Sequence, residues 1–320
     1  MSANVISAAG CGGMVAFALA EAVHAQTNAT ALEPGGRPEK FAVSASLRQP
    51  AVSGVNGKMD YSGGEMNSSA GHNISGSISL PVSHQFGFQA DALYSRISEV
   101  NFYGGAGHLF WRDPDYGLLG LTGGYLYRDS MDSVATFQSG VEGELYWHRF
   151  TLGFFGGVGN INYQYSTPFI ETRLNRFVGR VSADYYPLDN LRVGAAFSTA
   201  FREELGKVDI EYQTPINGIA LTGEAASGNY GYHHWLLGVR YYFGSKKSLR
   251  ARQRQDDPPG LMPQILQNLG VYGAEFNSKG KAYIAANPGT GTYHEQYGTS
   301  IQTIIVSLPS RQTVPVTSTP

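Results

Sequence analysis

The sequence predicts an all-β protein: a transmembrane antiparallel up-and-down β-barrel of about twelve strands, or ten in an alternative count, followed by an irregular C-terminal tail. Three observations support this. Only 15% of the 320 residues are charged, whereas soluble domains average roughly 25%. The chain is rich in Gly (41), Tyr (20) and Phe (16), yet its mean hydropathy is −0.21. Beyond the N-terminus no apolar run reaches the ~18 residues of a membrane helix, so alternating strands are the remaining way to cross a bilayer.

The alternation of apolar and polar residues indicates the same fold, and it is clearest over residues 232–243. Every second residue from Trp235 is apolar or aromatic, through Leu237, Val239, Tyr241 and Phe243. Successive side chains of a strand point to opposite faces, so this segment has one apolar and one polar face. A soluble sandwich or barrel would bury the apolar face. The composition favours a face that contacts lipid.

Similar segments recur between residues 40 and 244, the expected extent of the barrel. We expect strands near residues 40–47, 72–80, 86–95, 102–111, 118–126, 135–147, 150–159, 175–186, 191–201, 207–213, 219–226 and 232–243. Compact turns rich in Pro, Gly, Asp and Asn lie at 81–85, 112–117, 148–149, 187–190 and 214–218. The longer polar links 48–71 and 160–174 are expected as loops at the opposite end. The ten-strand count applies if 207–226 is an extracellular hairpin.

Aromatic residues are expected at both ends of the strands. Those predicted for a membrane interface are Phe86, Trp111, Trp147, Phe150, Tyr185, Trp235, Tyr241 and Phe243. A second group lies toward the longer links, at Tyr94, Tyr103, Tyr125, Phe177 and Phe197. Smaller apolar residues separate the groups. Two aromatic bands around an aliphatic centre are typical of the two membrane–water interfaces.

The N-terminus resembles a secretory signal peptide over residues 1–25. Residues 15–20 are apolar, and Val23, His24 and Ala25 form a small-residue cleavage site, although no Lys or Arg precedes the apolar stretch. A polar lead-in follows over 26–39. Cys11 is the only cysteine, so a mature chain beginning at Gln26 has neither a disulfide nor a thiol.

Three pieces of sequence resemble Gly-rich outer-membrane β-barrel proteins of Gram-negative bacteria, of alphaproteobacterial type and porin-like architecture. They are GFQADALYS (87–95), GAGHLFWRDPDYGLLG (105–120) and GVRYYFG (238–244). The resemblance implies location in the bacterial outer membrane, contact with its lipid, and insertion by the barrel-assembly machinery. It implies no particular activity. The chain departs from this pattern because a long tail follows the aromatic last strand.

The tail, residues 245–320, differs in composition from the rest of the chain. It carries eight Lys and Arg against four Asp and Glu and is rich in Pro, Gly, Ser and Thr, which predicts a largely disordered periplasmic segment. One or two helical turns are expected over 263–270, and a strand over 301–308. The basic start suits contact with anionic lipid or with the cell wall. A solvated charge run is the alternative.

The polar faces of the strands define the candidate lumen. They carry Gln89, Asp91, His108, Glu142, Glu144, Arg180, Asp184, Arg192, Asp209, Glu211, Glu224, His234 and Arg240. Acids outnumber arginines in this set, which predicts a narrow passive channel for small polar or cationic solutes. Alternatively, the acids pair with Arg180, Arg192 and Arg240 and close the interior. The barrel would then be structural or adhesive and would act through the loops 48–71 and 160–174.

The sequence does not favour an enzyme. A lipid-acting outer-membrane enzyme is a third hypothesis, but no Ser and His are spaced as a catalytic pair. His233 and His234 point to opposite faces of a strand and cannot hold one metal together. No motif indicates a metal or another cofactor. With a pI of about 6.4 and no basic face on the folded part, nucleic-acid binding has no support.

Overall fold

The computed structural model describes residues 49–130, 133–163, 170–171, 173–244, 246–286, 293–297 and 300–304. The predicted signal peptide (1–25), lead-in (26–39) and first strand (40–47) lie outside these residues.

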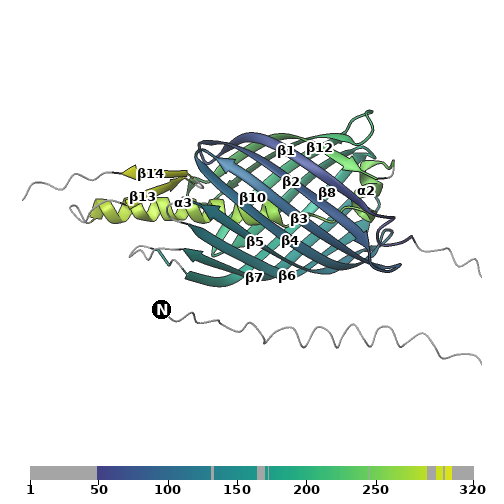
Figure 1. The fold of residues 1–320 in the computed structure, drawn as a ribbon, viewed down its shortest axis with the longest axis horizontal. Helices are drawn as coiled ribbons and strands as arrows, with labels where there is room; N and C mark the ends of the chain where they lie inside the picture. The colour runs from purple at the N-terminus through teal and green to yellow at the C-terminus, as the bar shows by residue number, and fades with distance from the viewer. Residues whose placement is uncertain are drawn as a thin grey trace, which may run out of the picture. The chain divides into compact units, whose positions relative to one another are not determined.

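Twelve antiparallel strands form a closed barrel in up-and-down order (Figure 1). The strands are β1 (Asn56–Met66), β2 (Ser69–Pro81), β3 (Phe86–Ile97), β4 (Val100–Asp113), β5 (Gly117–Asp129), β6 (Val134–Trp147), β7 (Phe150–Tyr163), β8 (Arg173–Leu188), β9 (Leu191–Ala200), β10 (Glu203–Gln213), β11 (Ile219–Gly228) and β12 (His233–Phe243). Pairing of β12 with β1, for example Tyr61 opposite Val239, closes the wall. The predicted fold class is therefore confirmed, and the ten-strand alternative is wrong because β10 and β11 both belong to the wall.

The first strand of the barrel is not where the sequence placed it. The expected loop 48–71 contains β1 and the beginning of β2. This prediction was wrong because Ser62, Gly63 and Gly64 interrupt the apolar alternation of β1. Glycine weakens the period-two pattern while the strand still forms through backbone pairing with both neighbours.

The two ends of the barrel differ less than expected. We call the end where β1 begins and β12 finishes the near end, and the opposite one the far end. At the far end, two-residue hairpins join β1 to β2 and β9 to β10. Their residues Asn67, Ser68, Phe201 and Arg202 have φ of 49°, 64°, 59° and 79°, the positive values that type I′ turns require. Only the nine-residue connection 164–172, within the expected loop 160–174, is long.

The outer surface of the barrel is apolar. Leu109, Leu121 and Val181 point outward and are 50%, 45% and 58% exposed. The predicted aromatic groups point outward as well, and ring pairs such as Phe150 with Tyr185 (4.8 Å between ring centroids) lie at the near end. A continuous apolar belt on a barrel without sheet edges is the surface that a lipid bilayer requires. Among the described residues, no helix has the length and hydropathy of a membrane span.

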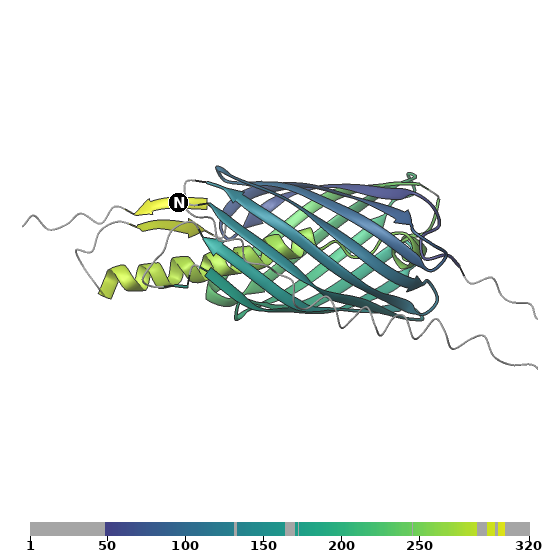
Figure 2. The same cartoon turned by 60° about the horizontal axis from the view of Figure 1, so that its bottom comes forward.

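The tail after β12 differs from the irregular segment expected for 245–320. It forms α2 (Leu249–Gln255), α3 (Met262–Ala286) and a hairpin of β13 (Tyr293–Tyr297) and β14 (Ser300–Ile304). Figures 1 and 2 show α2 at the near end and α3 running from inside the barrel out through the far end. The expectation of a largely disordered tail is therefore wrong for residues 249–286.

The helix α3 forms because its apolar residues share one side. Met262, Ile265, Leu266 and Leu269 follow the i, i+3, i+4, i+7 spacing of an amphipathic helix, and Pro263 lies in the first turn, where proline is tolerated. The helix is longer than the expected turns over 263–270. Gly270, Gly273 and Gly280 lower its intrinsic propensity, so packing against the barrel wall supplies the stability that the sequence alone does not indicate.

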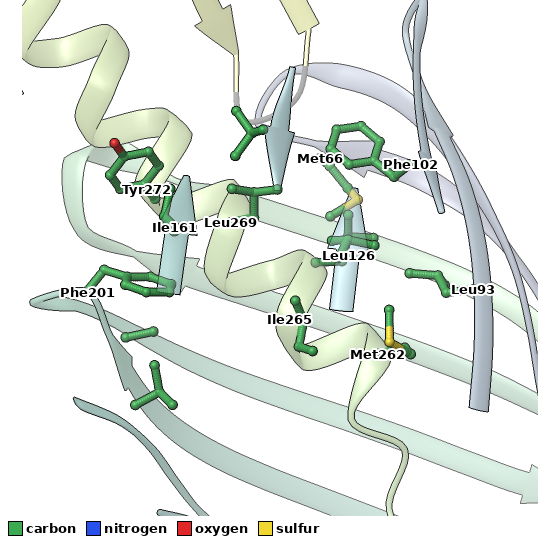
Figure 3. Packing of buried hydrophobic residues seen from close by; sticks show 14 of the residues in the cluster. Met66, Leu93, Phe102, Leu126, Ile161, Phe201, Met262, Ile265, Leu269 and Tyr272 are labelled. Atoms are coloured by element: carbon green, nitrogen blue, oxygen red, sulfur yellow. The ribbon is translucent and has the colours of Figure 1, made fainter. Parts of the chain in front are cut away.

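The apolar core of the protein lies between α3 and the inner wall. Ile265, Leu269 and Tyr272 pack among wall residues that include Phe102, Leu126, Ile161 and Phe201, as Figure 3 shows. These wall residues come from strands on several sides of the barrel and cluster toward its far end. The far half of the lumen is therefore a packed core, whereas the near half is polar.

Candidate functional site in the barrel lumen

The interior face of the barrel carries all thirteen residues predicted for the lumen. Asp91, His108, Glu142, Glu144 and Glu211 are nearly or fully buried there, as are Gln89 and His234. The remaining six, Arg180, Asp184, Arg192, Asp209, Glu224 and Arg240, are partly exposed inside the barrel. Whether any of them lines a conducting pore stays a prediction.

His108 of β4 joins two acids, one on β3 and one on β6. Its Nε2 lies 3.0 Å from Asp91 Oδ2, and its Nδ1 lies 2.9 Å from Glu142 Oε1. Gln89 donates to Asp91 (2.8 Å) and accepts from Ser79 (2.8 Å). These contacts tie β2, β3, β4 and β6 together, so the histidine cross-links the wall.

Arg192 of β9 holds together three acids of the two neighbouring strands, β8 and β10. It donates to Asp184 (2.7 Å), forms an ion pair with Asp209, and lies 3.6 Å from Glu211. Three carboxylates facing one another in this part of the wall would repel without a cation. The pairing that the sequence left as an alternative to an open acidic wall is therefore present for Arg192.

Arg240 makes the second such centre. It pairs with Asp60 and donates to Glu211 at 2.6 Å, while Tyr242 donates to the other oxygen of Glu211, also at 2.6 Å. Gln253 of α2 donates to Glu211 at 3.0 Å. Glu211 is fully buried, so these donors supply the compensation that a buried carboxylate needs.

Glu142 and Glu144, two of the acids predicted for the lumen, are both bound by other side chains of the wall. Glu142 is held by His108, and Glu144 accepts a hydrogen bond from Tyr146 Oη at 2.7 Å. Both side chains are at most 8% exposed. Their charges are therefore engaged within the wall.

Several functional residues were missed at the sequence level. Lys58 and Asp60 lie on β1, which the sequence did not reveal as a strand, and Lys207 lies 3.4 Å from Glu224. Lys58 forms an ion pair with Asp257 of the tail at 2.6 Å. The charged residues Lys58 and Asp60 alternate with Met59 and Tyr61, which face outward, and this period-two pattern could have identified the strand.

The basic start of the tail lies against the inner rim of the near end. Arg254 donates to the Phe150 carbonyl (2.7 Å), and its guanidinium lies 5.2 Å from the centre of the Tyr146 ring. Arg252 lies over Tyr242 at 4.6 Å, and Lys247 pairs with Asp256. These cations are engaged by the barrel and the tail itself, which differs from the solvated charge run considered as one alternative.

The far-end half of α3 carries its own ion pair. Lys279 donates a hydrogen bond to Glu275 one turn earlier, and this bond raises the pKa of the Lys279 ammonium above its ordinary value. The lumen-facing first half of the helix uses neutral amides instead: Gln267 donates to Glu224 (3.0 Å) and Asn268 to Gln138 (3.2 Å). Neutral donors satisfy wall acceptors without adding a buried charge.

A polar cavity of about 240 Å³ remains beside the tail. It lies between residues 253–267 and the inner faces of β8–β12 and β1. Its charged lining is balanced, with six basic and six acidic side chains: Lys58, Arg180, Arg192, Lys207, Arg240 and Arg254 against Asp60, Glu144, Asp184, Asp209, Glu224 and Asp257. Balanced charge gives the cavity no evident preference for either sign of ion, so the cation preference stays a prediction.

The predicted interface aromatics face outward, away from this lumen. Phe86, Trp147, Phe150, Tyr185, Trp235, Tyr241 and Phe243 are 36% to 64% exposed, and Trp111 is partly exposed beside Phe86. His233 is exposed and His234 buried, so the two point to opposite faces as expected. Among the described residues, no group of three or more His, Cys, Asp or Glu is arranged to hold a metal ion.

No protein-family description matches the chain, and no curated protein matches it. Among solved structures, the chain is similar to the KdgM porin in complex with disordered oligogalacturonate (TM-score 0.43, 13% identity, 58% of this chain and 99% of that one). It is also similar to the translocator domain of the autotransporter NalP from Neisseria meningitidis (0.36, 13%, 59% and 87%) and to Omp33 from Acinetobacter baumannii (0.35, 14%, 59% and 96%). These scores are too low to say anything of the activity of this chain, which therefore has to be argued from its own geometry.

Proposed function

We propose that the protein is a bacterial outer-membrane channel for small polar solutes whose lumen is held closed by its own C-terminal segment. One observation carries the proposal: residues 247–277 occupy the interior of a closed twelve-stranded barrel and leave a polar cavity beside them. The outer-membrane location rests on the closed wall and its apolar outer belt, because such barrels are the β-structures that cross lipid.

The chemistry of the lumen suits passive transport. The near half is lined by paired charges and amides, and the helix fills the far half. Displacement of α3 would join the cavity to the far end and leave a passage that is polar in its near half and lined by apolar wall residues in its far half. Because cations and anions are equally represented along the cavity, size would govern passage more than charge. A preference for cationic solutes would require an excess of free carboxylates, for example if Glu142 separated from His108 and Glu144 from Tyr146. The proposal includes no catalysis.

Planar-bilayer conductance of the full chain tests this function. The variant Ile265→Asp/Leu269→Asp places two carboxylates in the apolar contact between α3 and the wall, where both residues are at most 2% exposed. Unpaired charges cannot stay there, because burying them costs several kcal/mol each. We expect the variant to conduct ions severalfold better than the native chain. The matched variant Ser278→Asp/Ala282→Asp adds the same charges at exposed positions of the same helix and should behave as the native chain does.

A second function, a closed structural barrel, is favoured by the ion pairs of Arg192 and Arg240, which join nearby strands along the lumen wall. Under that function the wall itself restricts the interior. The Ile265→Asp/Leu269→Asp variant would then expose α3 to added protease without any gain in conductance. A gain in conductance would contradict the structural function, and its absence after release of the helix would contradict the channel.

A further inference from the structure

We infer that the C-terminal segment threads the whole barrel, so that the last part of α3, residues 278–286, lies at the cell surface while the beginning of β1 and the end of β12 face the periplasm. The barrel thereby holds the end of α3 on the opposite side of the membrane from the end of β12. This inference goes beyond the proposed channel, because it concerns which side of the membrane the chain reaches and holds whether or not the lumen conducts.

The segment enters the lumen at the near end. After β12 finishes at Phe243, the backbone N–H of Arg250 donates to the Asp189 carbonyl (3.0 Å) in the β8–β9 turn. Arg254 donates to the Phe150 carbonyl (2.7 Å) at the beginning of β7. Leu249 is fully buried against Ala220 and Tyr242. The helix α2 therefore sits inside the near mouth and contacts its rim on several sides.

The segment then crosses the polar half of the lumen in an extended run. Asp257 pairs with Lys58 of β1 (2.6 Å), and the Pro258 carbonyl accepts from Gln89 (3.4 Å). The backbone N–H of Leu261 donates to Asp91 (3.1 Å) just before α3 begins. Side chains of β1 and β3 thus bind a carboxylate and two backbone groups of the crossing segment.

The helix leaves through the far end. Tyr272 donates to the Glu171 carbonyl (2.8 Å) in the β7–β8 connection, and its ring lies 6.4 Å from that of Phe201 in the β9–β10 hairpin. Phe276 packs 5.4 Å from Tyr163, the last residue of β7. All three partners belong to the far end. Beyond Asn277 the helix reaches exposed positions, including Ser278, Ala282 and Ala285.

The length of the buried helix fits one complete passage. Residues 262–277 are almost all buried, which corresponds to about 24 Å at 1.5 Å per residue. Together with the extended run before α3, this exceeds the ~25 Å apolar band of a membrane barrel.

The wall of β4 and β5 is shaped for this passage. A Cβ at Gly124 would lie 2.9 Å from Ile265 Cδ1 and 2.9 Å from Ala106 Cβ, and one at Gly104 would clash with Met262 Cε and with the Tyr125 carbonyl oxygen of the next strand. Side chains at these two lumen-facing positions would collide with the first turns of α3. Glycine lets the helix approach the strands closely.

The far end is assigned to the cell surface from the connections. The longest one, 164–172, lies there, whereas the near-end turns have two to five residues; membrane barrels keep their short turns in the periplasm.

Cysteine labelling of intact cells tests the inference on the full chain. The background carries Cys11→Ser, which removes the only native cysteine. Three single replacements follow: Ala285→Cys near the end of α3, Glu99→Cys in the far-end β3–β4 hairpin, and Ser83→Cys in the near-end β2–β3 turn. All three positions are exposed. A membrane-impermeant maleimide should label Ala285→Cys and Glu99→Cys to a similar extent on intact cells, and Ser83→Cys only after the outer membrane is permeabilised.

Two outcomes would overturn the inference. Protection of Ala285→Cys together with Ser83→Cys would mean that the tail stays on the periplasmic side. Labelling of Ser83→Cys alone on intact cells would mean that the far end faces the periplasm. Heat-dependent mobility in SDS confirms that each variant is folded before labelling. The channel function is not needed for either result, so its failure in the conductance test is distinguishable from failure here.

Discussion

The substitution Ile265→Ala tests how strongly α3 is held in the lumen. Ile265 is fully buried in the cluster that joins the helix to the barrel wall, close to Gly124. Truncating a buried isoleucine to alanine costs 2–5 kcal/mol. We take the lower limit, about 2 kcal/mol, because the polar cavity nearby lets the site relax.

Nearly all of this loss should fall on the docked state, because the barrel wall closes through its own backbone pairing without the helix. A loss of about 2 kcal/mol raises the ratio of undocked to docked helix about 30-fold. In single-channel recordings of the full chain, the ratio of open to closed time should rise by this factor, with the open conductance unchanged.

Ser278→Ala is the control for this experiment, since it changes an exposed residue of the same helix. Its open-to-closed ratio should equal that of the native chain. The reasoning is refuted if Ile265→Ala and Ser278→Ala have equal ratios while protease reaches α3 more readily in Ile265→Ala, because release of the helix would then not open the lumen.

Three further predictions follow from the same structure. Gly124→Val should displace the first turns of α3 and increase conductance. Gly123→Val, on the lipid-facing side of the same strand, should leave conductance unchanged. Equal conductance of the two variants would contradict the close packing of helix and wall. Arg240→Met leaves buried Glu211 and Asp60 without their shared cation and should destabilise the barrel by about 3–5 kcal/mol, which lowers the temperature of its mobility shift in SDS. The triple change Arg240→Met/Asp60→Asn/Glu211→Gln removes both carboxylate charges as well and should recover most of this stability. If stability does not recover, the loss in Arg240→Met is steric. In the Ile265→Asp/Leu269→Asp background, Asp209→Asn should shift the reversal potential toward anion selectivity and Lys207→Gln toward cation selectivity, since both residues line the cavity. If neither change moves the reversal potential, ions do not pass through this cavity.

Much of the barrel could be predicted from the sequence because a strand with one apolar face leaves a direct period-two pattern. The segment from Trp235 to Phe243 and the Phe86–Ile97 strand are examples, and the structure has both as strands of the wall. The strand β1 was missed because Gly63 and Glu65 occupy outward positions where apolar side chains would mark the period. Its pairing with β2 and β12 is a long-range property that the local pattern does not contain.

The candidate site could be predicted only in part, for a different reason. Because successive side chains of a strand point to opposite faces, the sequence assigned residues such as Asp91 and Arg192 to the interior. Which acid meets which cation depends on register between strands, and the sequence left this open. The tail was harder still, because its glycines and amides resemble a disordered segment. Its order comes from partners such as Gln138 and Phe201, which lie far away in sequence.

The most direct test of the central claim is a thiol cross-link between α3 and the wall. In the Cys11→Ser background, the pair Gln138→Cys/Asn268→Cys replaces two side chains that share a hydrogen bond of 3.2 Å. A short bismaleimide should join them and change the mobility of the boiled chain. The control pair Gln138→Cys/Ser278→Cys moves the helix thiol ten residues along, or about 15 Å, and should stay unjoined. A cross-link in the first pair alone is the result that a helix docked in the lumen predicts. Equal cross-linking of both pairs, or of neither, would contradict it.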